Sequence, residues 1–321
     1  MTDHILKASC QTVHLGGFSH QLSPALTINS GDSIEIETYT GFYLYKQAPP
    51  DFLTPEFLDI CQHLPQERKV GPGPHLLTGP IYVANAEPGD VLEVKLKSIS
   101  PRLPVGFNAI RPGWGVLPQK FTESKLRFLP LDLDKGVAEF PKGSGIQIPL
   151  RPFFGIIGVA TTETNRSSIP PGNYGGNIDN RQLQAGSRIF LPVFVPGGLL
   201  SLGDGHSAQG DGEVNVTAIE TSMNGAIQVH LRKDLKLNSP IAETTTDIIT
   251  MGFGENLDQA LESALEQMIV FLEHFAGLSP EDAYVLCSLV VNFHITQGVN
   301  LPHKGVHGML PKCILPKAIE L

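Results

Sequence analysis

Residues 90–98 read DVLEVKLKS, and their alternation of apolar and polar side chains decides the fold class. In an extended chain successive side chains point to opposite faces, so Leu92, Val94 and Leu96 share one face. The charged residues between them share the other face. This pattern predicts a β-strand with one buried side and one solvated side.

The same alternation recurs elsewhere in the first 235 residues, at 33–37 (SIEIE) and 227–232 (IQVHLR). Longer apolar segments predict further strands over residues 188–202 and 214–219. Gly/Pro turns punctuate these segments, as in EPGD, RPG and PPGN. Many short strands separated by such turns are typical of a mainly β protein, a sandwich or a distorted barrel, and not of alternating βαβ units.

Helical signals are few before residue 250. Thr54 and Pro55 supply an N-cap and a proline at the first helical position, which predicts a short helix there. This helix falls in a proline-rich segment from Gln47 to Pro74, which we interpret as a surface flap.

After residue 250 the pattern becomes helical. Leucines recur at helical spacing from Leu257 to Leu272, and Gly277 ends the run. Ser279 predicts the cap of a second helix, and residues 290–296 predict a closing strand. We therefore expect two domains, a β-rich core over residues 1–235 that carries the site and a smaller α+β C-terminal lobe over residues 236–321.

The composition excludes several classes of partner. The 321 residues include 23 Lys plus Arg and 32 Asp plus Glu, a net charge of −9, so nucleic acid and anionic membranes are poor partners. No apolar run approaches the ~18 residues of a membrane span. The start, MTDHILKASC, lacks an apolar export signal, and we expect a cytoplasmic protein.

The densest polar cluster is GDGHSAQGDGE at residues 203–213. Strand alternation would place Asp204 and His206 on one face and Asp211 and Glu213 on another, and a short turn would fold the two pairs together. Carboxylates at such short distances repel one another unless a cation lies between them. The cluster predicts a divalent metal, zinc first because of the imidazole, with calcium or magnesium as alternatives. The alternative interpretation is a solvated Asp/Gly hairpin loop.

Two further segments carry polar groups. The stretch PPGNYGGNIDN at residues 170–180 would place Asn177 and Asp179 on one face, although an ordinary Asn/Gly turn has the same composition. His75 follows a Gly/Pro loop, where a lone histidine is commonly structural.

Common nucleophile and nucleotide motifs are missing from the sequence. No GxSxG, GxxxxGK[ST] or strand-to-helix GxGxxG is present. Hydrolysis by metal-activated water is the mechanism that the remaining residues allow.

Across these clusters the sequence resembles the acetamidase/formamidase family, from about Pro24 to Pro316. The GDxHxxQGDGE run at residues 203–213 is the most specific part of the resemblance. The other matching segments are TGPIYV at 78–83, AEPGDVL at 86–92, IPPG at 169–172, GGN at 175–177, LPVFV at 191–195 and KGVHGMLPK at 304–312.

The resemblance implies a jelly-roll-like β core, metal dependence, and hydrolysis of short amides to a carboxylate and ammonia. It also implies a homodimer or higher homo-oligomer. The resemblance implies, position by position, that the polar groups at the site are His75, Asp179, Asp204, His206, Asp211 and Glu213. It further implies that Gln209, Asn177 and His75 contact substrate or support the residues that do.

Our first hypothesis is a metal-dependent amidohydrolase in which Asp204, His206 and Asp211 hold the cation. Glu213 would be the general base for water; alternatively Glu213 is a ligand and Asp179 is the base. A second hypothesis is a non-catalytic β-sandwich that binds a cation or small ligand. A third, motivated by the unusual segment after Gln47, is hydrolysis of a bulkier or cyclic amide.

Overall fold

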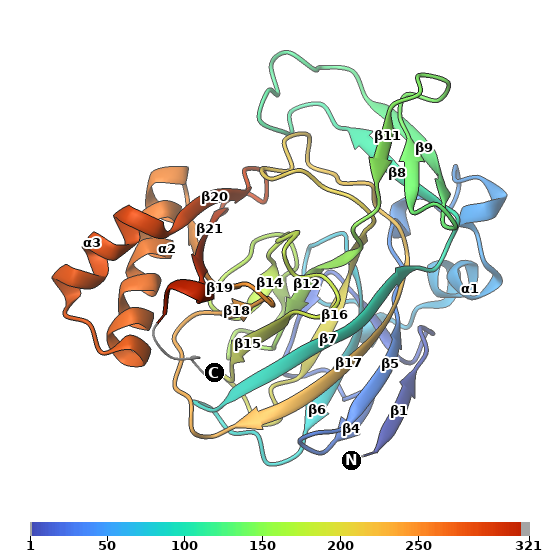
Figure 1. Cartoon of the computed structure of the whole chain (residues 1–321). Coiled ribbons are helices and arrows are strands. Elements are labelled where there is room, and N and C mark those ends of the chain that lie inside the picture. Colours follow the sequence, from blue (N-terminus) through green and yellow to red (C-terminus); the bar gives the residue numbers. More distant parts are fainter. Residues whose placement is uncertain (1, 316–321) are drawn as a thin grey trace.

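The computed structural model describes residues 2–315, and within them the chain is mainly β, as predicted (Figure 1). The largest sheet has nine strands, and segments from both ends of the chain contribute to it. In spatial order these strands are β1 (Asp3–Leu6), β5 (Ser33–Glu37), β17 (Met223–Arg232), β7 (Val91–Pro101), β15 (Arg188–Pro192), β18 (Ile241–Glu243), β19 (Asp247–Gly254), β21 (Lys304–Pro311) and β20 (Asn292–Gln297).

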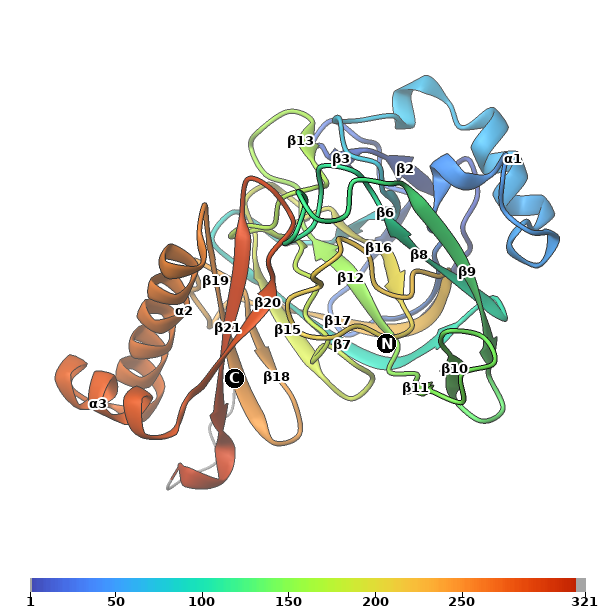
Figure 2. The ribbon, with the colours of Figure 1, turned by 90° about the horizontal axis from the view of Figure 1, so that it is seen from above.

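A second sheet packs against the first (Figure 2) and carries Asp204 and His206 of the polar cluster. Its strands are β14 (Gly175–Asn177), β12 (Phe153–Gly158), β16 (Leu200–His206), β6 (Leu76–Val83) and β2 (Val13–Leu15), with β4 (Leu26–Ile28) pairing in parallel with β6. The two sheets form the predicted sandwich.

Strand β7 shows why the two sheets pack together. Leu92, Val94 and Leu96 are buried in one cluster with residues of β12 and β16 from the facing sheet. On its opposite face Glu93 is also buried, because Arg188 Nη1 binds its carboxylate at 2.8 Å and Arg232 Nη1 at 3.1 Å. The alternation in DVLEVKLKS thus specifies the sandwich core on one side and an ion-paired surface on the other.

Two predicted strands were wrong. The segment 188–202 is not one strand: β15 and β16 lie in different sheets, separated by residues 193–199, where Gly197, Gly198 and Leu199 have positive φ. Residues 214–219 form no strand, and the backbone there includes Val216 at a φ of 79°. Positive φ interrupts the extended backbone, which an apolar composition alone does not reveal.

Smaller β elements extend from the sandwich. A four-stranded sheet forms the arm at the upper right of Figure 1, and a two-stranded ribbon joins distant segments. Their strands are β8 (Val105–Ile110), β9 (Lys125–Asp132), β10 (Val137–Glu139) and β11 (Gln147–Pro149), and β3 (Gly17–Phe18) with β13 (Arg166–Ser167).

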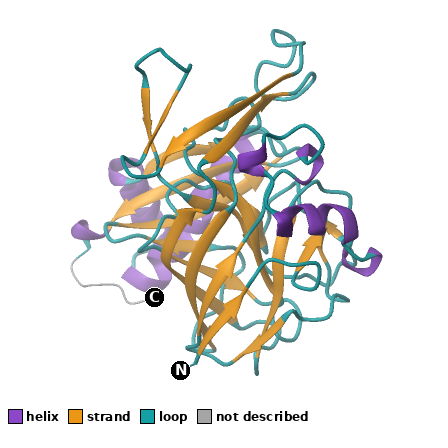
Figure 3. Cartoon of the chain, turned by 90° about the vertical axis from the view of Figure 1, so that its right-hand side faces the viewer, coloured by secondary structure: helices purple, strands orange, loops and turns teal. Residues whose placement is uncertain are grey.

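The C-terminal helices occur as predicted. Helix α2 (Leu257–Phe271) leads into a π-helical turn (Leu272–Ala276) that Gly277 ends, and the Ser279 side chain caps α3 (Pro280–Val290). These helices cover β19 and β21 near one edge of the large sheet (Figure 2), and they share a core with Phe190 of the central strand β15. Figure 3 shows them, in purple, behind the strands of the sandwich. The strands after residue 235 therefore share a sheet with those before it, and the division into two domains stays a prediction.

The proline-rich segment packs more tightly than a flap would. Helix α1 (Pro55–His63) begins at the predicted cap, with Thr54 Oγ1 accepting from the Phe57 amide. Phe52, Phe57 and Ile60 are buried in a second core beneath β8. Short 3₁₀ turns accompany it at Phe42–Leu44, Pro50–Phe52 and Gln66–Arg68, and another lies at Lys312–Ile314.

None of the helices that residues 2–315 form combines the length and hydrophobicity required to cross a membrane.

Candidate active site

Strand β16 supplies the first two site residues. Asp204 and His206 are both buried, and Asp204 Oδ2 lies 3.4 Å from His206 Nε2, so the predicted shared face is correct. Asp204 has a φ of 54°, in the left-handed region that few residues other than glycine adopt. Such strain is common where a side chain is held for function.

Asp179 joins them from the segment after β14. Its Oδ1 lies 3.8 Å from His206 Nδ1, and it too has a positive φ, of 51°. Gly155 on the neighbouring strand β12 makes the approach possible: a Cβ there would lie 2.4 Å from Asp179 Oδ1 and 2.9 Å from His206 Cε1. The site therefore depends on a glycine whose role the sequence does not signal.

The structure separates the other predicted pair, Asp211 and Glu213. Glu213 is buried in the cluster, whereas Asp211 lies outside it, with Oδ2 3.3 Å from His294 Nδ1 and Oδ1 3.9 Å from Arg181 Nε. The shared face required an extended backbone, but no strand forms here, and Gly212 and Glu213 have φ values of 94° and 44°. Of the predicted ligand set, the structure thus brings together Asp204 and His206 but not Asp211.

Glu220 is a site residue that the sequence analysis missed. It is buried, and its Oε2 lies 3.2 Å from His206 Nε2. Backbone bridges to His206 and to Phe107 hold it in place. It directly follows residues 214–219, which were predicted as an apolar strand, and a single acid after such a segment forms no recognisable motif.

Asn300 is a second residue that was missed. Its Nδ2 donates to Asp179 Oδ2 at 2.5 Å and to the Asn177 carbonyl at 3.2 Å. The loop that carries it, between β20 and β21, is tied down by Gln297, whose Oε1 accepts from the amides of Val299 and Asn300. More than 100 residues separate Asn300 from its partners, so only the fold reveals the contact.

Gln209 sets the orientation of the imidazole. Its Nε2 donates to the Asp179 carbonyl at 2.8 Å, which leaves Oε1 facing His206 Nδ1, also at 2.8 Å. An amide oxygen can only accept, so Nδ1 carries a proton and donates it. His206 Nε2 therefore faces Asp204 and Glu220, and it offers them a lone pair only when the imidazole is neutral.

The cluster opens into a cavity of about 290 Å³, which we call the reaction cavity. The predicted residues His75, Asn177, Asp179, Asp204 and Glu213 line it. The His75 ring lies with Nε2 3.9 Å from Asp204 Oδ2, while Nδ1 bonds to Ser168 Oγ at 2.8 Å. Pro72 and Pro74, from the proline-rich segment, also reach its wall, as do Tyr43, Arg111 and Trp114.

Burial and mutual repulsion shift the charges in this cluster. Burial raises the pKa of Asp179 to about 7, with the charge of His206 opposing it. Burial together with the Asp179 charge raises the pKa of Glu213 well above its ordinary value, and burial raises the pKa of Glu220. Burial alone would lower the pKa of His206, but the charges of Glu220 and Asp204 outweigh it and raise that pKa. Despite burial, His75 and His206 lower the pKa of Asp204.

The donor set fits a divalent cation. Ligand atoms of Asp204, His206 and Glu220 lie within 4.8 Å of one another, and so do those of Asp179, His206 and Glu213. Among residues 2–315, the buried atoms His206 Nε2, Asp179 Oδ1 and Glu213 Oε2 have no hydrogen-bond partner. Buried polar atoms rarely lack a hydrogen-bond partner. A mixed set of imidazole and carboxylate ligands suits zinc. A metal-binding histidine usually donates the N–H of its other ring nitrogen to an acceptor, as His206 Nδ1–H does to Gln209 Oε1.

Known proteins share this architecture. The structure of a recombinant predicted acetamidase/formamidase from the thermophile Thermoanaerobacter tengcongensis superposes with a TM-score of 0.85 at 32% identity, over 100% of this chain and 99% of that one. An acetamidase structure from Bacillus halodurans gives 0.84 at 27% identity, over 98% and 99% of the two chains. A formamidase from Methylophilus methylotrophus is 32% identical over 158 residues, 42% of this chain and 39% of that protein.

The alignments with curated relatives cover 16–55% of those relatives' own lengths. Residues 72–167 and 161–317, which together make up most of the chain, match the acetamidase/formamidase family. The chain therefore belongs to the acetamidase/formamidase family.

Proposed function

We propose that this protein hydrolyses a small linear amide, of the formamide or acetamide type, to a carboxylate and ammonia with the help of a divalent cation. One observation carries the proposal: four buried carboxylates, all lining one cavity, surround an imidazole whose Nε2 has no hydrogen-bond partner among residues 2–315. Family membership supports the reaction class, and the names of the relatives support the substrate class.

Asp204, His206 and Glu220 are the residues that would hold the cation, zinc in preference to calcium or magnesium. Their donor atoms converge on the side of the imidazole that Gln209 leaves free. When bound, such a cation lowers the pKa of water from about 15.7 to about 7 and polarises the substrate carbonyl.

Asp179 and Glu213 are left to move protons. Both carboxylates line the reaction cavity, and each has one oxygen without a hydrogen-bond partner in the described part of the chain. Glu213 is the preferred general base, because the other oxygen of Asp179 is already bonded to Asn300. Asp179 in its protonated form would then donate a proton to the leaving nitrogen, so that ammonia departs.

Ammonia release from a panel of small amides, measured before and after chelation and again after zinc is restored, tests this function. We expect activity that chelation removes and zinc restores. Glu213→Gln should keep its metal but lose about 10²–10⁴-fold in kcat, the usual contribution of a general base. Undiminished turnover in metal-free protein would refute the proposal.

Asp211→Asn separates the two possible ligand sets. If the cation is held by Asp204, His206 and Glu220, this variant keeps its metal, whereas Glu220→Gln loses it. The opposite result would support the ligand set predicted from the sequence. Elemental analysis of the purified variants provides the measurement.

A homo-oligomeric state and a cytoplasmic location remain part of the proposal. Exposed apolar side chains on α3, including Tyr284, Val285 and Leu289, are compatible with contacts between copies. Sedimentation velocity over a range of protein concentrations tests the oligomeric state.

A further inference from the structure

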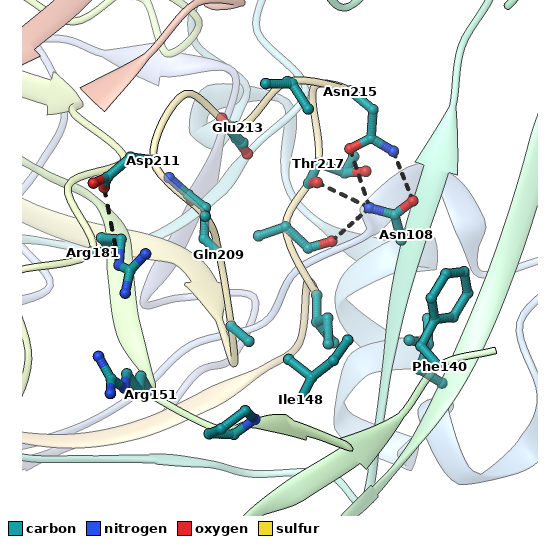
Figure 4. Close-up of a pocket in the computed structure, with 17 residues that line it drawn as sticks. Asn108, Phe140, Ile148, Arg151, Arg181, Gln209, Asp211, Glu213, Asn215 and Thr217 are labelled. Carbon is teal, nitrogen blue, oxygen red and sulfur yellow. Dashed lines mark hydrogen bonds and ion pairs between the residues drawn. The ribbon is translucent and has the colours of Figure 1, made fainter. Parts of the chain in front are cut away.

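A second cavity of about 600 Å³, which we call the side chamber (Figure 4), shares lining residues with the reaction cavity. Residues of the loop after β16 line both cavities. Acetamide and a cation fit the smaller space of about 290 Å³, so neither accounts for the larger one.

The side chamber adjoins the reacting groups. Glu213 and Thr217 line both cavities, and Glu213 Oε2 has no hydrogen-bond partner in the described residues. Gln209 also lines the side chamber while it holds His206 Nδ1. A substrate whose amide lies against Glu213 can therefore extend into this space.

One side of the side chamber is cationic. Figure 4 shows Arg151 and Arg181 on the same side of it. The Arg151 side chain has no hydrogen bond or ion pair with any of residues 2–315. The Nε of Arg181 lies 3.9 Å from Asp211 Oδ1, too far for a hydrogen bond, and Asp211 is closer to His294. The exposed Arg151 thus has no acidic partner in the described chain, Arg181 has only the distant Asp211, and both guanidinium groups keep free donors.

The remaining walls are largely apolar. Phe140 and Ile148, on the arm formed by β8–β11, line the side chamber together with Leu129 and Ile219. The amides of Asn108 and Asn215 bond to each other, and Asn108 Nδ2 also donates to the Thr217 carbonyl, so they offer little to a ligand. A ligand that matches these walls has an apolar chain and an anionic end.

We propose that the side chamber binds the tail of the substrate, and that the preferred substrates are amides whose apolar chain ends in a carboxylate. This inference rests on the proposed amide hydrolysis. Arginine suits the task, because its planar fork of donors matches a carboxylate.

Ammonia release from monoamides of dicarboxylic acids, compared with neutral amides of equal chain length, tests the inference. We expect kcat/KM to favour the anionic amides by at least about tenfold at an optimal chain length. Arg151→Gln and Arg181→Gln should each reduce that preference by about tenfold, the usual order for a charge-assisted hydrogen bond. Lys142→Gln, on the exposed β10–β11 turn, is the control and should keep it.

The outcomes separate the two proposals. If the protein hydrolyses acetamide but shows no preference for anionic amides, the tail site is refuted and amide hydrolysis stands. If no amide is hydrolysed, calorimetry of zinc-loaded protein with a dicarboxylate and with the monocarboxylate of equal length still tests the tail site. Selective dicarboxylate binding that Arg151→Gln abolishes supports it, and equal binding of both acids overturns it.

Discussion

At the scale of single residues, the absence of a side chain at Gly155 is as important as the acids around it. The Cβ of an alanine would lie 2.4 Å from Asp179 Oδ1, closer than any real contact allows. We predict that Gly155→Ala displaces Asp179 and His206 and lowers kcat/KM for acetamide by about 100-fold or more, because misplacement of reacting groups by about 1 Å costs that much.

Gly210→Ala is the matched control for Gly155→Ala. It lies in the loop after β16, where no atom comes within 4 Å of an added Cβ. Circular dichroism and thermal unfolding should show that both variants fold. Wild-type activity in folded Gly155→Ala would show that the close packing around Asp179 is dispensable.

His14 provides a prediction about stability. It is fully buried on β2, bonded to Ser201 Oγ at 2.9 Å, and burial lowers its pKa to about 3 from 6.5. In the unfolded chain His14 therefore binds a proton below pH 6.5, whereas in the folded protein it stays unprotonated down to about pH 3. Between these values His14 lowers the free energy of unfolding by about 1.4 kcal/mol for each pH unit of acidification, and above pH 6.5 it has no such effect.

Urea unfolding at pH 7.5 and pH 5.0 measures this dependence. From pH 6.5 to 5.0 the His14 contribution amounts to about 2 kcal/mol. His14→Gln should show a smaller loss between the two conditions, whereas exposed His20→Gln should behave as wild type. An unchanged pH dependence in His14→Gln would contradict the assignment.

At the scale of elements, the β20–β21 loop supports the site from the far end of the chain. Gln297 holds the amide of Asn300, and Asn300 holds Asp179. Loss of the charge-assisted bond to Asp179 should lower kcat by about 10–100-fold in Asn300→Ala, in line with roughly 1.5–3 kcal/mol for such a bond. KM should change little if Asn300 acts only by positioning Asp179.

A double-mutant cycle checks that the two residues act in series. Gln297→Ala should lower kcat less than Asn300→Ala, and the double variant should be no worse than Asn300→Ala alone. Thr244→Ala, in the remote β18–β19 turn, serves as the control. Multiplicative effects of the two substitutions would show that Gln297 and Asn300 act independently.

Elements were predictable where local rules govern them. Side-chain alternation identified β5, β7 and β17, and caps identified the starts of α1 and α3. The same alternation misplaced Asp211, because positive φ at Gly212 and Glu213 turns the two acids in different directions. Side chains alternate between two faces only while the backbone stays extended.

At the scale of the whole molecule, the sandwich assembles a site that no local segment contains. Strand β16 contributes Asp204 and His206, the segment after β14 contributes Asp179, and a loop more than 100 residues later contributes Asn300. Glu220 and Asn300 could not be predicted, because their roles arise from contacts across the fold and not from spacing. Asp179, Asp204, His206 and Glu213 could be placed together because short motifs and the family resemblance both pointed to them.

The central claim is that this buried cluster holds a divalent cation at His206 Nε2. The most direct measurement is an anomalous difference map, recorded at the zinc absorption edge from crystals of the zinc-loaded protein. We predict a peak about 2.0–2.2 Å from His206 Nε2 and within bonding distance of Asp204 and Glu220. A map from zinc-loaded crystals without a peak at these atoms, or with the zinc bound elsewhere, would contradict the claim.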